Sequence, residues 1–328
     1  MTYRGLLIFL TTLVLLAFFT SMLIGPAGVG PVESLAALWH GEGALGLIMR
    51  EIRLPRAILG VLVGAALGLS GAAMQGFLRN PLAEPGLLGV SSSAALGAVI
   101  ALQAGVASAG AIFVPLAALT GAVCSVALIL LLAGPRGPSL TLILAGVAIS
   151  ALAGALISLV LNLSPNPYAV SEIVFWLLGS LSDRSLQDVS LALPFMALGA
   201  VMLAGLGRGL DALTLGEDTA EAMGMRLMRL RLRLVFGTAA LVGAAVAVAG
   251  AIGFVGLVVP HILRPFVGAR PSRLLASSAL GGALMILIAD IAVRLIAPDR
   301  DLKLGVLTAI VGAPFFLHLI WRTKKTLQ

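Results

Sequence analysis

Long apolar segments alternate with short polar breaks along almost the whole chain. A helix needs about 20 mostly apolar residues to cross roughly 30 Å of hydrocarbon, and these segments reach or approach that length. A single segment can satisfy its own backbone polar groups in lipid only as a helix, so the pattern predicts an all-α integral membrane protein. The approximate ranges of the segments are 5–24, 57–78, 87–107, 110–133, 139–162, 189–207, 234–256, 274–297 and 304–321.

A tenth crossing is predicted from the positions of the basic residues. The stretch 257–268, GLVVPHILRPFV, is short for a span, so its length alone does not decide whether the chain crosses there. With a cytoplasmic N-terminus, a crossing divides Lys and Arg 14 inside to 7 outside, whereas no crossing divides them 11 to 10. Basic residues concentrate in cytoplasmic loops. We therefore expect one ten-helix domain over residues 1–328, with both termini cytoplasmic.

Composition excludes a soluble globular protein and a nucleic-acid-binding protein. The chain is 60% hydrophobic and 11% charged, with a mean hydropathy of +1.12, whereas soluble domains are about 25% charged. The net charge of +7 comes from basic residues in the breaks between apolar segments, without interleaved aromatic residues. This distribution is typical of the positive-inside bias.

An internal repeat relates the two halves of the chain. LVGAALGLSGA at 62–72 and LVGAAVAVAGA at 241–251 share seven of eleven residues, and Pro81 aligns with Pro260 at the same offset. Segments rich in Gly and Ala also resemble one another by composition alone. The aligned prolines favour a duplicated five-helix unit, and an odd number of helices per unit makes the two units inverted, as in many transporters.

The longest charged break, residues 208–233, is predicted to be a cytoplasmic docking loop. Thr214 and Glu217 have the spacing of a capping box, which predicts a short helix beginning there, and Gly224 is typical of a helix end. A solvated connector that obeys the positive-inside rule is the alternative. The apolar residues that such a helix would expose are Leu215, Ala222 and Met223.

No catalytic motif is present in the sequence. There is no G-x-x-x-x-G-K-[ST] loop for a triphosphate, and the three histidines are far apart, without the spacing of a metal or nucleophile motif. We expect a transport subunit and not an enzyme, with no metal site and no cofactor in this chain. Any ATP hydrolysis, with its bound ATP and Mg²⁺, would have to come from a separate partner ATPase.

An ion-coupled secondary transporter is the main alternative, and a non-transporting scaffold or receptor is another. Acidic residues within the apolar segments are almost limited to Asp290, and a proton or sodium relay normally needs more of them. A scaffold would have an uninterrupted helix where this chain has a break between Asn80 and Pro85. Both alternatives are therefore disfavoured.

Eight motifs, in order along nearly the whole chain, resemble those of FecCD-type permeases, the membrane subunits of importers for ferric siderophores, haem and cobalamin. They are RLPR at 53–56, LVGAALGLSGAAMQGFLRNPLAEPGLLGVSSSA at 62–94, LILAGVA at 142–148, FWLLGSL at 175–181, LGEDTAEAMG at 215–224, AGAIGFVGLVVPHILR at 249–264, ADIAVR at 289–294 and LGVLTAIVGAPFF at 304–316. The chain departs from the family with DLKLG at 301–305, where members often have E-[LI]-P-x-G.

The resemblance implies a ten-helix subunit of the bacterial inner membrane. Such a subunit would pair with a second copy of itself and bind two ATP-binding-cassette ATPase subunits. It would receive its cargo from an extracytoplasmic substrate-binding protein. The cargo stays open among ferric siderophore, haem, cobalamin and an oxyanion.

The resemblance also assigns roles to individual positions. Docking to glutamates of the binding protein falls to Arg53, Arg56 and Arg294. Coupling to the ATPase falls to Leu215, Gly216, Glu217, Asp218, Ala222 and Gly224. The cytoplasmic gate falls to Asn80, Leu82, Ser139 and Thr141.

Overall fold

The computed structural model describes residues 2–25, 30–40, 43–106, 110, 112–134, 139–297 and 302–326. Within these ranges the chain is helical and has no strand, so the all-α prediction is confirmed. The elements of the first half are α1 (Tyr3–Leu23), α2 (Pro31–His40), α3 (Ala44–Leu47), η1 (Ile48–Arg53), α4 (Leu54–Leu78), η2 (Pro85–Leu88), α5 (Val90–Gln103), α6 (Phe113–Ala133) and α7 (Ser139–Asn162). Those of the second half are α8 (Pro167–Leu177), α9 (Leu186–Ala204), α10 (Gly207–Leu213), α11 (Glu217–Ala222), α12 (Leu227–Ala249), α13 (Val255–Leu263), η4 (Arg264–Val267), α14 (Pro271–Ile296) and α15 (Leu304–Thr326).

Among the described residues, seven helical segments are long and apolar enough to cross a membrane. These are α1, the continuous run from α3 to α4, α6, α7, α9, α12 and α14. Shorter apolar helices accompany them, namely α5, α8, α13 with η4, and residues 304–319 of α15. Every segment predicted from the sequence therefore contains an apolar helix, and the chain is a multi-pass membrane protein.

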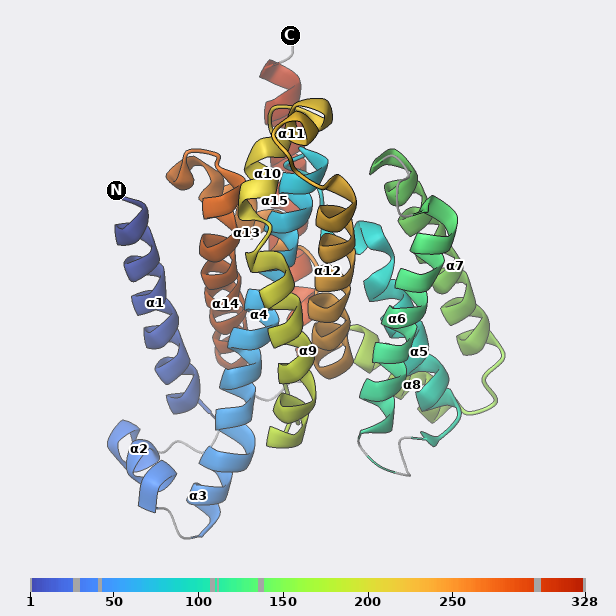
Figure 1. Ribbon diagram of the computed structural model, residues 1–328. Coiled ribbons are helices and arrows are strands. Elements are labelled where there is room, and N and C mark those ends of the chain that lie inside the picture. The colour runs from blue at the N-terminus through green and yellow to red at the C-terminus, as the bar shows by residue number, and fades with distance from the viewer. Residues whose placement is uncertain are drawn as a thin grey trace.

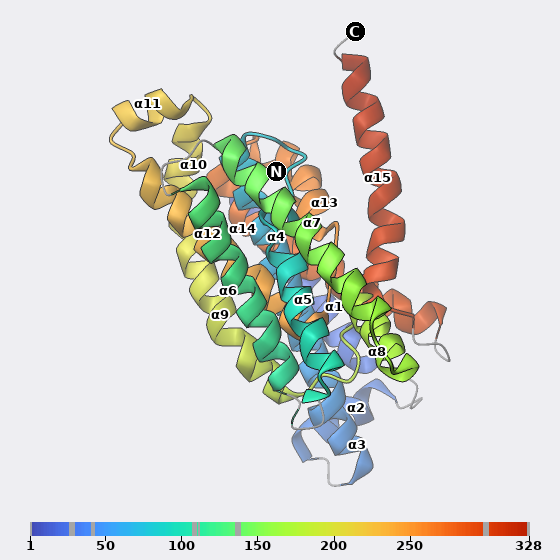
Figure 2. The same cartoon turned by 90° about the vertical axis from the view of Figure 1, so that its right-hand side faces the viewer.

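The helices form a bundle whose two ends differ (Figure 1). Both chain termini lie toward the end that carries α10 and α11, whereas α2 and α3 cover the opposite end. We refer to these as the α11 end and the α2 end. In the view turned by 90°, α15 stands along one edge of the bundle and α8 lies near the α2 end (Figure 2).

Helices α4 and α14 form the central contact of the bundle, and glycines make it possible. A Cβ added to Gly64 would collide with the carbonyl oxygen of Gly282, and one added to Gly68 would collide with that of Ser278. Small residues at such contacts let helix backbones approach closely, which is how helices associate inside lipid. Most of α4 between Pro55 and Phe77 is buried as a result.

Two helices of the bundle are interrupted. After α4, Arg79 takes a left-handed φ of 50°, and a loop leads to the short 3₁₀ helix η2. After α12, Gly250 has a φ of 70° and a loop leads to α13. Pro81 lies in the first loop, whereas Pro260 lies inside α13. The prolines that align in the sequence repeat therefore occupy different local structures.

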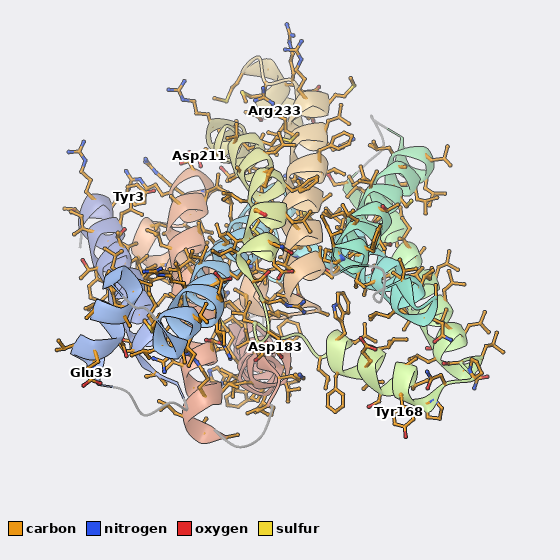
Figure 3. All side chains as sticks on the ribbon, turned by 90° about the horizontal axis from the view of Figure 1, so that it is seen from below. Tyr3, Glu33, Tyr168, Asp183, Asp211 and Arg233 are labelled. Carbon is orange, nitrogen blue, oxygen red and sulfur yellow. The ribbon has the colours of Figure 1, made fainter. Side chains whose placement is uncertain are left out.

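The short helices α2, α3, α8 and α10 were not predicted. Each is well below the length of a membrane span, so a search for long apolar segments passes over them. Asn166 caps α8, because its side chain accepts a hydrogen bond from the N–H of Tyr168. The Tyr168 side chain is 86% exposed and points away from the bundle (Figure 3).

Candidate functional site

The coupling segment, which we define as residues 207–225, lies at the α11 end (Figures 1 and 2). Helix α11 ends in a Schellman motif. The N–H of Gly224 donates to the Glu221 carbonyl at 2.8 Å, and the N–H of Met225 donates to the Ala220 carbonyl at 3.0 Å. Gly224 has a φ of 83°, which a residue without a Cβ adopts at little cost. The predicted end of the helix at Gly224 is confirmed.

The surface of α11 is both apolar and acidic. Leu215 and Met223 are 63% and 61% exposed, and Asp218 and Ala222 are exposed beside them. The predicted loop of residues 208–233 is too long at its C-terminal end, because α12 already begins at Leu227. Exposed apolar side chains rimmed by carboxylates are typical of a surface that another protein covers.

The predicted capping box at Thr214 and Glu217 is wrong. Gly216 is the N-cap of α11 and makes no side-chain bond, while the Thr214 hydroxyl donates back to the Asp211 carbonyl at 2.6 Å. The Glu217 carboxylate instead accepts a hydrogen bond from the hydroxyl of Ser139, the first residue of α7, at 3.1 Å. A tertiary contact therefore replaces the local cap.

A second carboxylate of the coupling segment is bound to α14. Asp211 Oδ1 accepts the backbone N–H of Ser272 at 2.8 Å, and its Oδ2 accepts the Ser272 hydroxyl at 2.6 Å. Ser272 is the second residue of α14, whose N-cap makes no side-chain bond. Asp211 thus caps α14 from another helix, where a negative charge also interacts favourably with the helix dipole.

The loop after α4 forms a compact turn around Asn80. Asn80 Oδ1 accepts the N–H of Leu82 at 2.9 Å, and the Asn80 carbonyl accepts the N–H of Ala83 at 3.1 Å. η2 then packs against α7, since a Cβ on Gly146 would collide with the Leu87 carbonyl oxygen. The structure thus brings the predicted gate loop to the helix that begins with the predicted gate residues Ser139 and Thr141.

Helix α13 is seated on α4 by a buried amide. Pro260 has no N–H, so the carbonyl of Gly256 lacks its normal helical donor. The Gln75 side chain fills this role, because its Nε2 donates to the carbonyls of Leu257 at 3.2 Å and Gly256 at 3.5 Å. Arg264 completes the contact by donating from Nη2 to Gln75 Oε1 at 2.6 Å.

Glu84 joins the two interruptions. Its Oε1 accepts the N–H of Phe254, the residue before α13, at 3.3 Å. The next residue, Pro85, contacts the same helix, because a Cβ on Gly256 would lie 2.8 Å from the Pro85 Cδ. A backbone N–H at a helix start has no partner within its helix, and a carboxylate is well suited to accept it.

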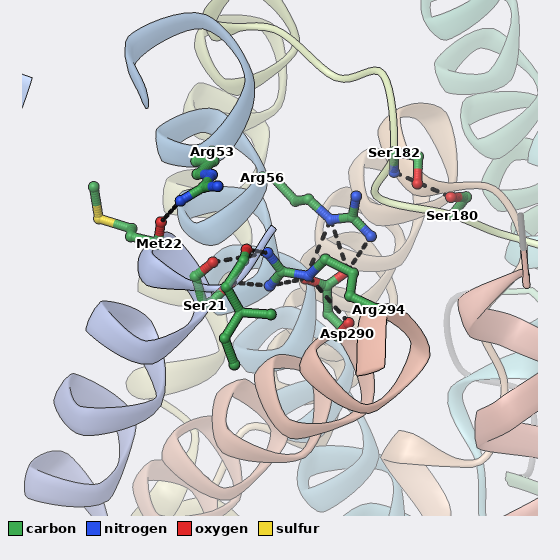
Figure 4. A network of polar contacts seen from close by, with 9 residues as sticks. Ser21, Met22, Arg53, Arg56, Ser180, Ser182, Asp290 and Arg294 are labelled. Carbon is green, nitrogen blue, oxygen red and sulfur yellow. Dashed lines mark hydrogen bonds and ion pairs between the residues drawn. The ribbon is translucent and has the colours of Figure 1, made fainter. Parts of the chain in front are cut away.

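The three predicted docking arginines belong to a network at the α2 end (Figure 4). Asp290, whose side chain is 2% exposed, is its centre. Arg56 approaches Asp290 with Nη2 at 2.8 Å and Nε at 2.9 Å from Oδ1, and Arg294 Nη2 lies 2.8 Å from Oδ2. The network joins α4 to α14, because Arg56 belongs to α4 and Asp290 belongs to α14.

Arg53 and Arg294 also cap the C-terminal end of α1. Arg294 Nη1 donates to the carbonyls of Ser21 and Ile24, both at 2.7 Å. Arg53 Nη1 donates to the carbonyl of Met22 at 3.0 Å (Figure 4) and to that of Leu23 at 3.1 Å. Arg53 is only 4% exposed. Helix ends leave such carbonyls without helical donors, and a positive charge there is favourable. Docking by these arginines stays a prediction. Docking requires an accessible side chain, whereas that of Arg53 is buried.

Several residues of this architecture were not found from the sequence. The contacts of Asp211, Glu84 and Gln75 are with residues far away in the chain, and sequence spacing does not reveal such contacts. The one available signal was that Gln75 and Glu84 lie inside the family-like motif at 62–94. Part of the divergent DLKLG motif lies outside the described residues. In the part of the chain that the structure describes, no group of three or more His, Cys, Asp and Glu residues could hold a metal ion.

Comparison with known proteins defines the class. The sequence profile of the FecCD transport family matches residues 13–322, and the chain belongs to this family. The hemin transport system permease protein HmuU of Yersinia pestis is 38% identical, over 95% of each chain. The cobalamin import system permease protein BtuC of Halobacterium salinarum is 41% identical over 84% of this chain and 73% of the relative.

A solved structure has the same fold. It is described as an inward-facing conformation of a metal-chelate type ABC transporter, and it is 31% identical with a TM-score of 0.86. The similarity covers 97% of this chain and 99% of the other. The bundle described above is therefore the fold of an ABC transporter permease.

Proposed function

We propose that this chain is the membrane-spanning subunit of an ATP-driven importer that carries a metal chelate into the cytoplasm. The observation that carries the proposal is family membership over residues 13–322, combined with an exposed apolar and acidic helix at the α11 end. The chain supplies the path and no covalent chemistry. Two ATP-binding-cassette subunits supply ATP hydrolysis.

The proposed topology has ten crossings with both termini in the cytoplasm. The seven long spans are supplemented by α5, α13 with η4, and α15, while α8 lies at the membrane surface. Both termini lie toward the α11 end (Figure 1), which is the arrangement that an even number of crossings requires. We place the α11 end in the cytoplasm because basic residues concentrate in cytoplasmic loops. The inverted five-helix repeat belongs to the same proposal.

The partners follow from the two ends and the sides of the bundle. The ATPase subunits dock on the coupling segment through Leu215, Met223 and their acidic neighbours. A second copy of the chain packs against α7 and α15, which expose apolar residues such as Leu144 and Val311. An extracytoplasmic binding protein docks at the α2 end, where Arg56 is the partly exposed member of the arginine network.

Transport proceeds by alternating access. ATP binding closes the ATPase subunits, the coupling segment moves, and the path between the two copies exchanges outward for inward opening. The turn at Asn80 and Leu82, with Ser139 and Thr141 at the start of α7, forms the cytoplasmic gate. Interrupted backbone of this kind is tolerated in a membrane only where protein or a water-filled cavity surrounds it.

Reconstitution tests the proposal. The chain, its ATPase and its binding protein are placed in proteoliposomes and offered ferric dicitrate, a ferric siderophore, haem and cobalamin. Uptake of one cargo that is lost without ATP or without the binding protein is expected and would identify the substrate. Uptake that proceeds without the ATPase and collapses with the ion gradient would replace the proposal with a secondary transporter.

A further inference from the structure

We infer that Asp211 and Ser139 are positioning residues that tie the coupling segment to α14 and α7, so that movement of α11 reaches both helices. The inference rests on the proposed function. Its basis is the pair of side-chain contacts that leave the coupling segment in different directions, from Asp211 to Ser272 and from Glu217 to Ser139.

The contact with α14 fixes both position and orientation. The two Asp211 oxygens bind two different donors of Ser272, and a two-point contact to an ionised group is stronger and more directional than a single bond. α10 also packs directly against this turn, since a Cβ on Gly207 would lie 3.0 Å from the Ser272 Cβ. The first turn of α14 therefore cannot move freely against α10.

Helix α14 continues this connection to the opposite end of the bundle. It is a single helix of 26 residues, which corresponds to about 39 Å at 1.5 Å per residue. Its last turns contain Asp290 and Arg294, the centre of the arginine network. One continuous helix thus joins the coupling segment to the α2 end, where we propose that the binding protein docks.

The contact with α7 leads to the interrupted segment. Glu217 is the first residue of α11 and Ser139 the first residue of α7, so the hydrogen bond joins the starts of the two helices. Two turns further along α7, Gly146 is in contact with Leu87 of η2. A displacement of α11 is thereby passed through α7 to the segment that follows the Asn80 turn.

The test compares variants that break each contact with variants that preserve it. Asp211→Ala removes both acceptors, whereas Asp211→Asn keeps an oxygen for the Ser272 N–H. Ser139→Ala removes the donor to Glu217 without changing the surface of α11. Glu172→Ala is the control, because it removes an exposed carboxylate from α8, outside the coupling segment.

The measurements are made on the complete complex in proteoliposomes. Two rates are recorded for each variant, ATP hydrolysis with binding protein present, and uptake of whichever of ferric dicitrate, haem or cobalamin the wild type transports. We expect Asp211→Ala and Ser139→Ala to lower uptake per ATP hydrolysed at least fivefold, while the ATPase subunits still copurify. Asp211→Asn and Glu172→Ala should retain the wild-type ratio.

Three outcomes would overturn the inference. The first is an unchanged ratio of uptake to ATP hydrolysis in both Asp211→Ala and Ser139→Ala. If only the amount of folded complex falls in these variants, the two residues have a structural role alone. The second is a loss in Asp211→Asn equal to that in Asp211→Ala, because charge and not the contact would then matter. If Asp211→Ala does not assemble, Ser139→Ala decides, since it changes one hydroxyl. The third is a wild-type complex without ATP-dependent uptake, which would refute the proposed function itself.

Discussion

Replacing Asp290 with Asn tests whether the arginine network holds α1, α4 and α14 together. The Asp290 side chain is 2% exposed, and those of its partners Arg56 and Arg294 are 16% and 11% exposed. All three groups are largely withdrawn from solvent, and one carboxylate serves both guanidinium groups. Asn has the same shape but no charge, so Asp290→Asn leaves two cations close together without their shared counter-ion.

The expected cost is large for a single substitution. Removing one partner of a buried ion pair typically costs about 3–5 kcal/mol, because an uncompensated charge remains. Arg294 also holds the Ser21 and Ile24 carbonyls of α1, so its displacement would loosen that helix as well. Chains of 150–250 residues lose roughly 2–4 °C in Tm per kcal/mol, and we expect a fall of several degrees here.

Thermal unfolding of the purified chain in detergent micelles measures this effect. Asp183→Asn is the matched control, because Asp183 is an exposed aspartate in the loop between α8 and α9. Adding Arg56→Met to Asp290→Asn removes one of the two unpaired cations and leaves the contacts of Arg294 with α1 intact, so the double variant should recover part of the loss. Equal Tm values for Asp290→Asn and Asp183→Asn would refute the assignment of Asp290 as the centre of the network.

Three further predictions concern glycines and the seat of α13. Gly68→Ala should lower the free energy of unfolding by about 1–3 kcal/mol, because the new Cβ would meet the α14 backbone. Gly76→Ala is the control and should cost less, since its Cβ would have its nearest contact at 3.3 Å. Equal Tm values for the two variants would contradict the close packing of α4 and α14. Gln75→Leu should lower the Tm, since each unsatisfied buried polar group costs about 1–3 kcal/mol. It should also reduce uptake clearly below the wild-type rate, but severalfold less than a change that blocks the gate. Gly224→Trp should abolish uptake without affecting membrane insertion or dimer assembly, and Gly224→Ala should retain more activity; normal uptake by the Trp variant would contradict the coupling role.

Local features of the sequence predicted much of this protein. Segment length and hydropathy located most of the membrane helices closely, because both properties depend only on neighbouring residues. The exception is α12, which spans Leu227–Ala249 where 234–256 was predicted. α7 agrees with its predicted range at both ends, and Gly224 ends α11 because a left-handed residue is required there. The ordered motifs predicted the family, to which the chain belongs.

Contacts between distant residues were decided only by the tertiary structure. Thr214 and Glu217 have the spacing of a local cap, yet Glu217 binds Ser139, which lies 78 residues away. The docking prediction for Arg53 identified a suitable cation, but packing placed it against the end of α1, where it is buried. Charge and spacing show what a side chain is able to bind. Which partner it binds depends on the helices that packing brings beside it, as the glycine contacts bring α4 beside α14.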